Sequence, residues 1–160
     1  MEPLRVMTWT TLVVLVLLVD GITSCYCPPM PFQDQFCNSP LAIKGFVESG
    51  EPVWYGFRRE YTRYVVKIDH VFKKPASEMF GEKIVISVPY QPSMCGATLS
   101  EGQSYLLTGS YFPSNFEKYQ TNACDLIDRY ENLSAEEIEG ISGGFGCNFN
   151  MQKEINFKTY

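Results

Sequence analysis

The sequence predicts a small, closed, mainly β barrel of the five-stranded Greek-key (OB) type, with one or two short helices and three disulfides. Apolar and polar residues alternate with a period of two through Val53–Phe72, and further short strand-like runs lie on either side of it, whereas a clear helix start occurs once. The chain also contains six cysteines, an even number, all of which follow an apolar leader. This combination is typical of a secreted domain held together by disulfides.

Residues 1–24 are expected to be a signal peptide. A basic residue near the start precedes an unbroken apolar run, Leu12–Val19, and Ser24 then occupies the last position of an acceptable signal-peptidase site. Asp20 ends the run well short of the roughly 20 apolar residues that a transmembrane helix needs. We therefore expect a secreted, extracellular protein without a membrane span, whose first mature residue is Cys25 with a free α-amino group.

Removal of the leader would leave 136 residues, enough for one domain with a modest core. The expected domain spans residues 25–147 and is followed by a short C-terminal tail, residues 148–160. The mature part holds 16 acidic and 12 basic residues, a net charge of −4, which argues against a nucleic-acid partner.

The first strands are expected early in the mature chain. Leu41–Val47 forms the first strand, and Glu48–Pro52 contains the glycine and proline of a turn. Val53–Phe72 is a long alternating segment with one buried face. The residues of that face include Thr62, Tyr64, Val66, Ile68 and Phe72.

Three further strands and one helix follow. The strands are expected at Lys83–Val88, Ser104–Phe112 and, with a weaker pattern, Lys118–Cys124. Ser134 and Glu137 have the spacing of a capping box, so a helix should begin there and end at Gly140 or Gly143. Pro75–Glu82 is expected to be a loop with a single turn of helix.

The most unusual stretch is TSCYCPPMPFQDQFCNSP, residues 23–40. A metal site, a redox-active thiol pair and a disulfide-locked binding edge are the three interpretations. An extracellular location oxidises thiols, and a bond between Cys25 and Cys27 would be strained, so each is expected to bond to a distant cysteine. Spacing alone does not choose among the 15 possible pairings. Structural stapling of a small secreted domain is the alternative to a binding role.

An enzyme is not expected. His70 is the only histidine, so no zinc site of several histidines can be assembled. A serine nucleophile activated by His70 is not expected either, because the sequence contains no G-x-S-x-G motif. The glutamates near residue 137 are typical of a solvated helix start, and the GGFG stretch before Cys147 is typical of a turn. We expect no cofactor of the protein's own.

The stretch from Cys25 to Ser39 resembles the mature N-terminus of the tissue inhibitors of metalloproteinases (TIMP family). Members of that family begin with a Cys-x-Cys pair, followed by a proline-rich stretch, a glutamine and the sequence Phe-Cys-Asn-Ser. In this chain Gln33 matches the glutamine and residues 36–39 match Phe-Cys-Asn-Ser. Arg63–Lys74, Pro92–Gly96 and Leu133–Cys147 also resemble segments of this family, so the similarity covers nearly all of residues 25–147.

The resemblance implies a netrin-like OB barrel with the pairings Cys25–Cys95, Cys27–Cys124 and Cys37–Cys147. It implies a monomeric inhibitor of matrix metalloproteinases or related zinc endopeptidases, acting in the extracellular matrix. The α-amino nitrogen and carbonyl oxygen of Cys25 would chelate the target's catalytic zinc, and Tyr26 would enter its S1′ pocket. The implied inhibitory wedge consists of Cys25, Tyr26, Cys27, Pro28, Pro29, Ser93, Met94, Cys95 and Gly96, with Trp54 and Tyr55 extending the contact.

The sequence also departs from the family. Tyr26 replaces a threonine or serine, and because a phenol ring needs a deep pocket, targets with shallow pockets are expected to be refused. Met94 replaces a smaller branched residue. Thirteen residues follow Cys147, so the second six-cysteine domain of vertebrate members is expected to be absent. The alternative function is a non-inhibitory netrin-like module that binds a matrix protein or growth factor. Asn132 lies in an N-glycosylation sequon.

Overall fold

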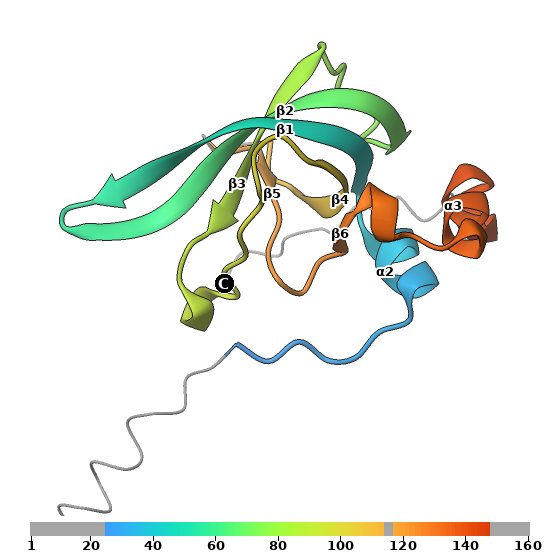
Figure 1. Cartoon of the computed structure of the whole chain (residues 1–160), viewed down its shortest axis with the longest axis horizontal. Coiled ribbons are helices and arrows are strands. Elements are labelled where there is room, and N and C mark those ends of the chain that lie inside the picture. The colour runs from blue at the N-terminus through green and yellow to red at the C-terminus, as the bar shows by residue number, and fades with distance from the viewer. Residues whose placement is uncertain (1–24, 114–116, 148–160) are drawn as a thin grey trace, which may run out of the picture.

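The structure is a computed structural model that describes residues 25–113 and 117–147 (Figure 1). The predicted signal peptide, residues 1–24, and the predicted tail, residues 148–160, lie outside the described residues. The strands are β1 (Leu41–Tyr55), β2 (Arg58–Lys73), β3 (Lys83–Pro89), β4 (Ser104–Tyr111), β5 (Tyr119–Gln120) and β6 (Ile127–Arg129). The α-helices are α2 (Phe32–Asn38) and α3 (Ala135–Ser142), and the short 3-10 turns are η1 (Pro92–Met94), η2 (Tyr130–Asn132) and η3 (Gly144–Gly146).

Five of the strands close into a ring, which confirms the predicted mainly β barrel. Their order is β1-β2-β3-β5-β4, and β4 pairs back with the first part of β1. All neighbours are antiparallel except β3 and β5, and β6 adds to β4 outside the ring. Closure pairs both edges of β1: Ile43 lies opposite Val71 on β2 and Leu107 on β4.

The turn predicted at Glu48–Pro52 is wrong, because β1 continues to Tyr55. The chain reverses at Gly56, whose φ of +61° suits a glycine in a tight turn. Gly50 instead leaves room for the Tyr64 ring on β2, because a Cβ added at residue 50 would lie 2.7 Å from that ring. Pro52 is tolerated because β4 pairs only with residues 41–46, so the outer part of β1 is an edge.

The barrel interior is filled by the apolar face that the alternation predicted. Thr62, Tyr64 and Val66 are each at most 3% exposed. Tyr64 and Val66 belong to an apolar cluster whose other buried members are Leu41, Ile43, Val47, Ile84, Ile86, Val88, Leu99, Tyr105, Leu107 and Tyr119.

A second apolar cluster lies where the two α-helices flank one end of the barrel (Figure 1). Phe36 on α2 is fully buried, and its ring centroid lies 5.6 Å from that of Phe145 and 6.3 Å from that of Phe72. The Cys37–Cys147 disulfide ties α2 to the segment after α3, with the two Cα atoms 5.5 Å apart. This end therefore has a core of its own.

The predicted capping box of α3 is present. The Ser134 hydroxyl accepts a hydrogen bond from the Glu137 amide (3.2 Å), and the Glu137 carboxylate accepts one from the Ser134 amide (2.8 Å). Gly143 is the C-cap, as one of the two predicted glycines. The helix α2 and the turn η1 were not predicted, and Lys118–Cys124 contributes only the two residues of β5.

Candidate functional site

Two disulfides fix the first described residues to the barrel. Cys25 is bonded to Cys95 and Cys27 to Cys124, with Cα atoms 5.0 and 5.2 Å apart across 70 and 97 residues of sequence. The Cys124 sulfur lies 3.7 Å from that of Cys25 and 3.6 Å from that of Cys95, so the two bridges pack against each other. In the chain-entropy description, closing loops of this length stabilises a fold by about 4–5 kcal/mol per bridge.

The same four cysteines form a cluster of metal-ligating atom types. Their sulfurs lie within 4.8 Å of one another, and among the described residues this is the one such convergence of three or more histidine, cysteine or acidic side chains. Metal binding and redox exchange both require thiolates, and all four sulfurs are in disulfides. The arrangement therefore favours the disulfide-locked edge among the three interpretations of this stretch.

The loop that receives Cys25 has a tightly specified backbone. After η1, Cys95 adopts a left-handed conformation with φ of 55°, and its amide donates to the Pro92 carbonyl at 3.1 Å. Gly96 follows and donates to the Gln91 carbonyl at 2.9 Å. A Cβ on Gly96 would lie 2.7 Å from backbone atoms of Tyr90 and Gln91, so glycine is required here.

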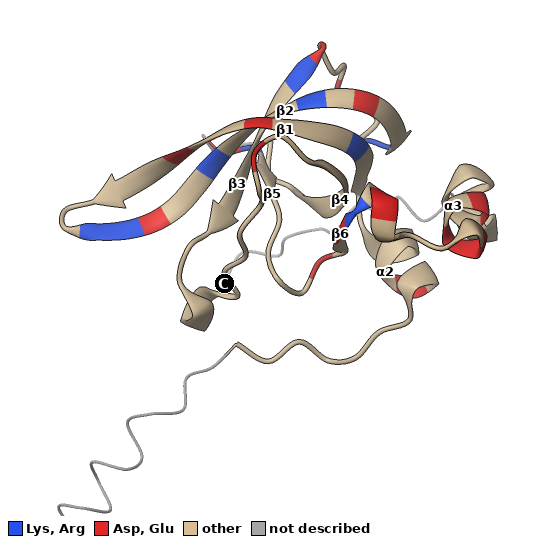
Figure 2. Cartoon of the chain, in the orientation of Figure 1, with Lys and Arg blue, Asp and Glu red and all other residues tan. Residues whose placement is uncertain are grey.

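Cys25 and Cys27 thus lie beside the loop that carries Cys95, and we call residues 25–29 and 93–96 together the N-terminal edge. All nine predicted wedge residues belong to it. Tyr26 (80% exposed), Met94 (38%), Pro28, Pro29 and Ser93 are exposed, whereas the three cysteines and Gly96 are half-buried. Residues 25–31 and 92–98 contain no charged side chain, so this part of the ribbon is tan in Figure 2. The edge is therefore a surface without charged side chains that two disulfides hold in place.

A hydrogen-bonded turn supports the edge from beneath. The Cys95 carbonyl accepts from the Ala123 amide at 2.8 Å, and the Asn122 side chain accepts from the Cys124 amide at 2.8 Å. Asp125 in turn accepts from the Asn122 amide at 2.9 Å. Burial raises the pKa of Asp125, although the hydrogen bonds that its carboxylate accepts from the Asn122 amide and the Thr121 hydroxyl oppose the shift. The sequence analysis did not predict this supporting turn. The available signal was the pair Asn122 and Asp125 on either side of Cys124, because Asn and Asp side chains often bond to the backbone of turns.

The β1–β2 hairpin is attached to the same loop. Arg58 donates to the Gln91 side chain at 2.8 Å, and the Arg59 guanidinium lies 4.1 Å from the centroid of the Tyr90 ring. Trp54 lies near the hairpin tip and is exposed. The hairpin and the N-terminal edge are thus joined through residues 90 and 91.

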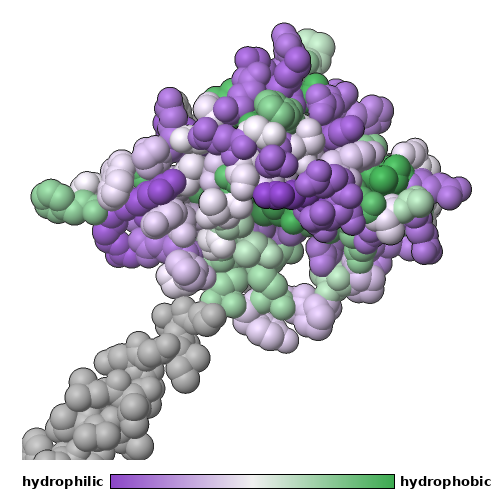
Figure 3. Space-filling model, viewed as in Figure 1, coloured by the Kyte–Doolittle hydropathy of each residue, from purple (hydrophilic) through white to green (hydrophobic). Residues whose placement is uncertain are grey.

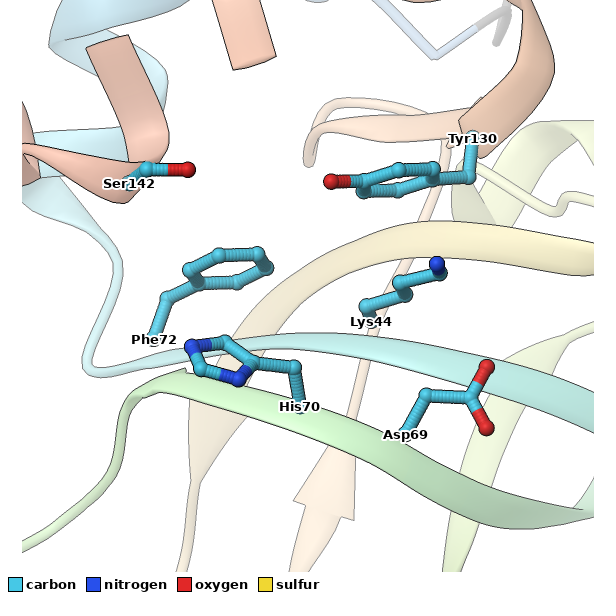
Figure 4. Close-up of a pocket in the computed structure, with 6 residues that line it drawn as sticks. All are labelled: Lys44, Asp69, His70, Phe72, Tyr130 and Ser142. Atoms are coloured by element: carbon cyan, nitrogen blue, oxygen red, sulfur yellow. The ribbon is translucent and has the colours of Figure 1, made fainter. Parts of the chain in front are cut away.

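A shallow pocket of about 280 Å³ at the helical end is the other candidate (Figure 4). It is lined by Lys44, Asp69, His70, Phe72, Tyr130 and Ser142. The Lys44 ammonium lies 4.1 Å from the Tyr130 ring centroid, and His70 packs against Phe72 with ring centroids 4.6 Å apart. The Ser142 hydroxyl donates to the Ile138 carbonyl at 2.7 Å, so it is engaged with its own helix rather than with His70. The pocket therefore lacks an activated nucleophile.

Asn132, the predicted glycosylation acceptor, is exposed at the end of η2. Its side-chain amide donates to Asp128 at 3.3 Å. The described helices include none with the length and apolar character of a membrane span.

Comparison with known proteins identifies a family. The family model of the tissue inhibitor of metalloproteinase matches residues 23–153. The chain is 30% identical to metalloproteinase inhibitor 3 of Xenopus laevis over 129 residues, which cover 77% of this chain and 56% of that protein. It is 26% identical to metalloproteinase inhibitor 4 of Mus musculus over 160 residues, which cover 94% of this chain and 70% of that protein. It is 25% identical to metalloproteinase inhibitor 2 of Homo sapiens over 146 residues, which cover 85% of this chain and 63% of that protein. The chain thus spans 56–70% of the length of these three relatives.

Proposed function

The chain belongs to the tissue inhibitor of metalloproteinase family, and from that premise we propose that it is a secreted inhibitor of matrix metalloproteinases or related zinc endopeptidases. The N-terminal edge is the inhibitory surface. The observation that carries this proposal is the position of Cys25, which is tied to Cys95 within an edge that has no charged side chain. Cores of protein interfaces are depleted of charged residues, so such an edge suits an enzyme's cleft.

Inhibition works by chelation of the enzyme's metal. Cleavage after Ser24 frees the α-amino group of Cys25, and its nitrogen and the Cys25 carbonyl oxygen form a five-membered ring with the zinc. Catalytic zinc keeps one position open for water on three protein ligands, and the chelating residue displaces that water. An α-amino group has a pKa of about 7.7–8.0, so loss of its proton near neutral pH costs little.

The neighbouring residues supply specificity and affinity. Tyr26, 80% exposed beside the chelating atoms, enters the S1′ pocket of the enzyme. Cys27, Pro28 and Pro29 follow the primed side of the cleft, and residues 93–96 contact its other part. Because two disulfides hold these segments in place, little conformational entropy is lost on docking.

One added residue tests the chelation. Protein that begins at Cys25 is compared with protein that carries a single alanine before it, and both are titrated against a panel of metalloproteinases. The extra residue converts the α-amine into an amide and should weaken inhibition by about 100-fold or more, equivalent to about 2.7 kcal/mol. Circular dichroism and mass spectrometry confirm that both forms are folded with three disulfides.

Two results would contradict this proposal. Equal inhibition by both forms would show that zinc chelation is not the mechanism. Lack of inhibition by both, with the fold intact, would favour the non-inhibitory binding module.

A further inference from the structure

The tip of the β1–β2 hairpin exposes three aromatic side chains within four residues. Trp54, Tyr55 and Phe57 are 59%, 82% and 103% exposed. The hairpin extends away from the barrel, and its end is one of the apolar regions of the face shown in Figure 3. Apolar surface of this extent on a soluble protein usually marks an interaction site.

The three side chains do not form one flat face. Trp54 and Tyr55 are successive residues of β1, and successive side chains of a strand point to opposite faces. Phe57 follows in the turn after Gly56, where the chain reverses. A single protein surface would cover one side of such a tip, whereas a lipid layer would surround it on all sides.

The nearest charges suit an anionic surface. Arg58 lies opposite Tyr55, and Arg59 lies opposite Trp54. Residues 54–59 contain these two cations and no acidic residue, and the closest acidic residues, Glu51 and Glu60, lie farther from the turn. Basic residues just behind apolar anchors attract the phosphates of a membrane surface.

We propose that residues 54–59 form a membrane-anchoring tip that inserts into the interfacial region of a phospholipid bilayer. The amphipathic rings of Trp54 and Tyr55 suit the headgroup level, and Phe57 reaches the acyl boundary. Arg58, which is exposed, lies at the phosphates, whereas the half-buried Arg59 is held against Tyr90 and Thr62. Since the whole chain has a net charge of −5, binding depends on the inserted aromatic residues more than on long-range attraction.

Anchoring would hold the N-terminal edge close to the membrane. Arg58 and Arg59 connect the tip to Gln91 and Tyr90, which precede the loop of Cys95. A tip embedded in lipid therefore leaves the edge beside the bilayer, where membrane-bound enzymes act. The inference does not depend on inhibition and is tested separately from it.

Tryptophan fluorescence provides the test. The chain contains two tryptophans, Trp54 and Trp9, and the latter lies in the predicted leader. The protein secreted on expression of the full chain, with its N-terminus checked by mass spectrometry, is mixed with vesicles of phosphatidylcholine alone or with phosphatidylserine. We expect the emission to shift to shorter wavelength and to be quenched by lipids with brominated acyl chains. Trp54→Phe should abolish this signal.

Matched variants identify the residues that insert. Tyr55→Ser with Phe57→Ser keeps the Trp54 reporter and should lower the partition coefficient by about tenfold or more. Met79→Ser removes another apolar side chain, 93% exposed but away from the tip, and should leave binding unchanged. Arg58→Gln should weaken binding to anionic vesicles more than to neutral ones.

Three outcomes would overturn the proposal. The first is that neither kind of vesicle shifts or quenches the tryptophan emission, and the second is that the double variant binds vesicles as well as the wild type does. The third is that a soluble metalloproteinase catalytic domain shifts the emission whereas vesicles do not. The last outcome would assign the tip to a protein contact. Vesicle binding should survive the alanine extension before Cys25, so failure of the inhibition proposal and failure of this one are distinguishable.

Discussion

Cys25 and Cys95 are joined by a disulfide across 70 residues of sequence, with their Cα atoms 5.0 Å apart. The position of Cys25 is therefore determined by the loop that carries Cys95. That loop is fixed by a left-handed Cys95 and by the close approach of Gly96 to residues 90 and 91. Backbone geometry far along the chain thus decides where Cys25 lies.

Gly96→Ala should weaken both the fold and the inhibition. The new Cβ would lie 2.7 Å from backbone atoms of Tyr90 and Gln91, so the loop must shift, at a cost of about 1–3 kcal/mol in the free energy of unfolding. Urea unfolding with the disulfides intact and the inhibition constant are the measurements. Gly81→Ala is the control, because nothing lies within 4 Å of its added Cβ. If the two variants unfold alike, the close approach of Gly96 does not matter.

Tyr26→Thr should change the range of enzymes inhibited and leave stability almost unaltered. The side chain is 80% exposed, and replacement of such a residue usually alters stability by less than about 0.5 kcal/mol. A smaller side chain should fit shallow S1′ pockets that exclude a phenol ring. Inhibition constants against enzymes with deep and shallow pockets check this. An unchanged profile would show that Tyr26 does not enter the pocket.

The barrel was predictable because its strands carry their burial pattern in the sequence. The alternation through Thr62, Tyr64 and Val66 matches a face that is buried in the structure. The helix α2 was missed because tertiary contacts, more than local signals, stabilise it. Phe36 is buried under Phe145, and the Lys73 ammonium donates to the Phe36 carbonyl at 2.9 Å, which satisfies the helix end. Its local signal was the four-residue spacing of Phe32 and Phe36.

Less of the candidate site than of the barrel could be predicted from the residues alone. Cysteine spacing allows 15 pairings, and the choice depends on which loops the barrel brings together, so the pairing came from the family resemblance. The supports of the edge were missed for the same reason. Gln91 and Asn122 act through contacts with Arg58 and the Cys124 amide, which only the folded chain brings about.

Ser134→Ala should destabilise the helical end of the protein. The substitution removes the hydroxyl that accepts from the Glu137 amide, and loss of such a cap costs about 0.5–2 kcal/mol. Ser134→Thr is the matched control, because it keeps both the cap and the sequon of Asn132. Thermal unfolding should be compared in protein made without glycosylation, so that a glycan does not contribute. Equal stability of the alanine and threonine variants would show that the cap is unimportant.

Glu78 should make stability depend on pH in the acidic range. Its carboxylate accepts hydrogen bonds from the Tyr111 and Tyr119 hydroxyls, the latter at 2.8 Å, and these bonds lower the pKa of Glu78 below its ordinary 4.5. The folded state therefore binds this proton less tightly than the unfolded state. The resulting stabilisation is fully present above pH 4.5 and is lost as the pH falls through the lowered pKa.

Glu78→Gln isolates that contribution. The glutamine variant should be less stable than the wild type at neutral pH, and the difference should shrink as the pH falls below 4.5. Burial and the nearby carboxylate raise the pKa of Tyr119, so both tyrosines remain donors throughout this range. Urea unfolding from pH 7 to pH 3 measures the effect, and Glu82→Gln, at an exposed carboxylate (73%), is the control. A constant difference between wild type and Glu78→Gln across this range would mean that the tyrosine hydrogen bonds do not favour the charged carboxylate.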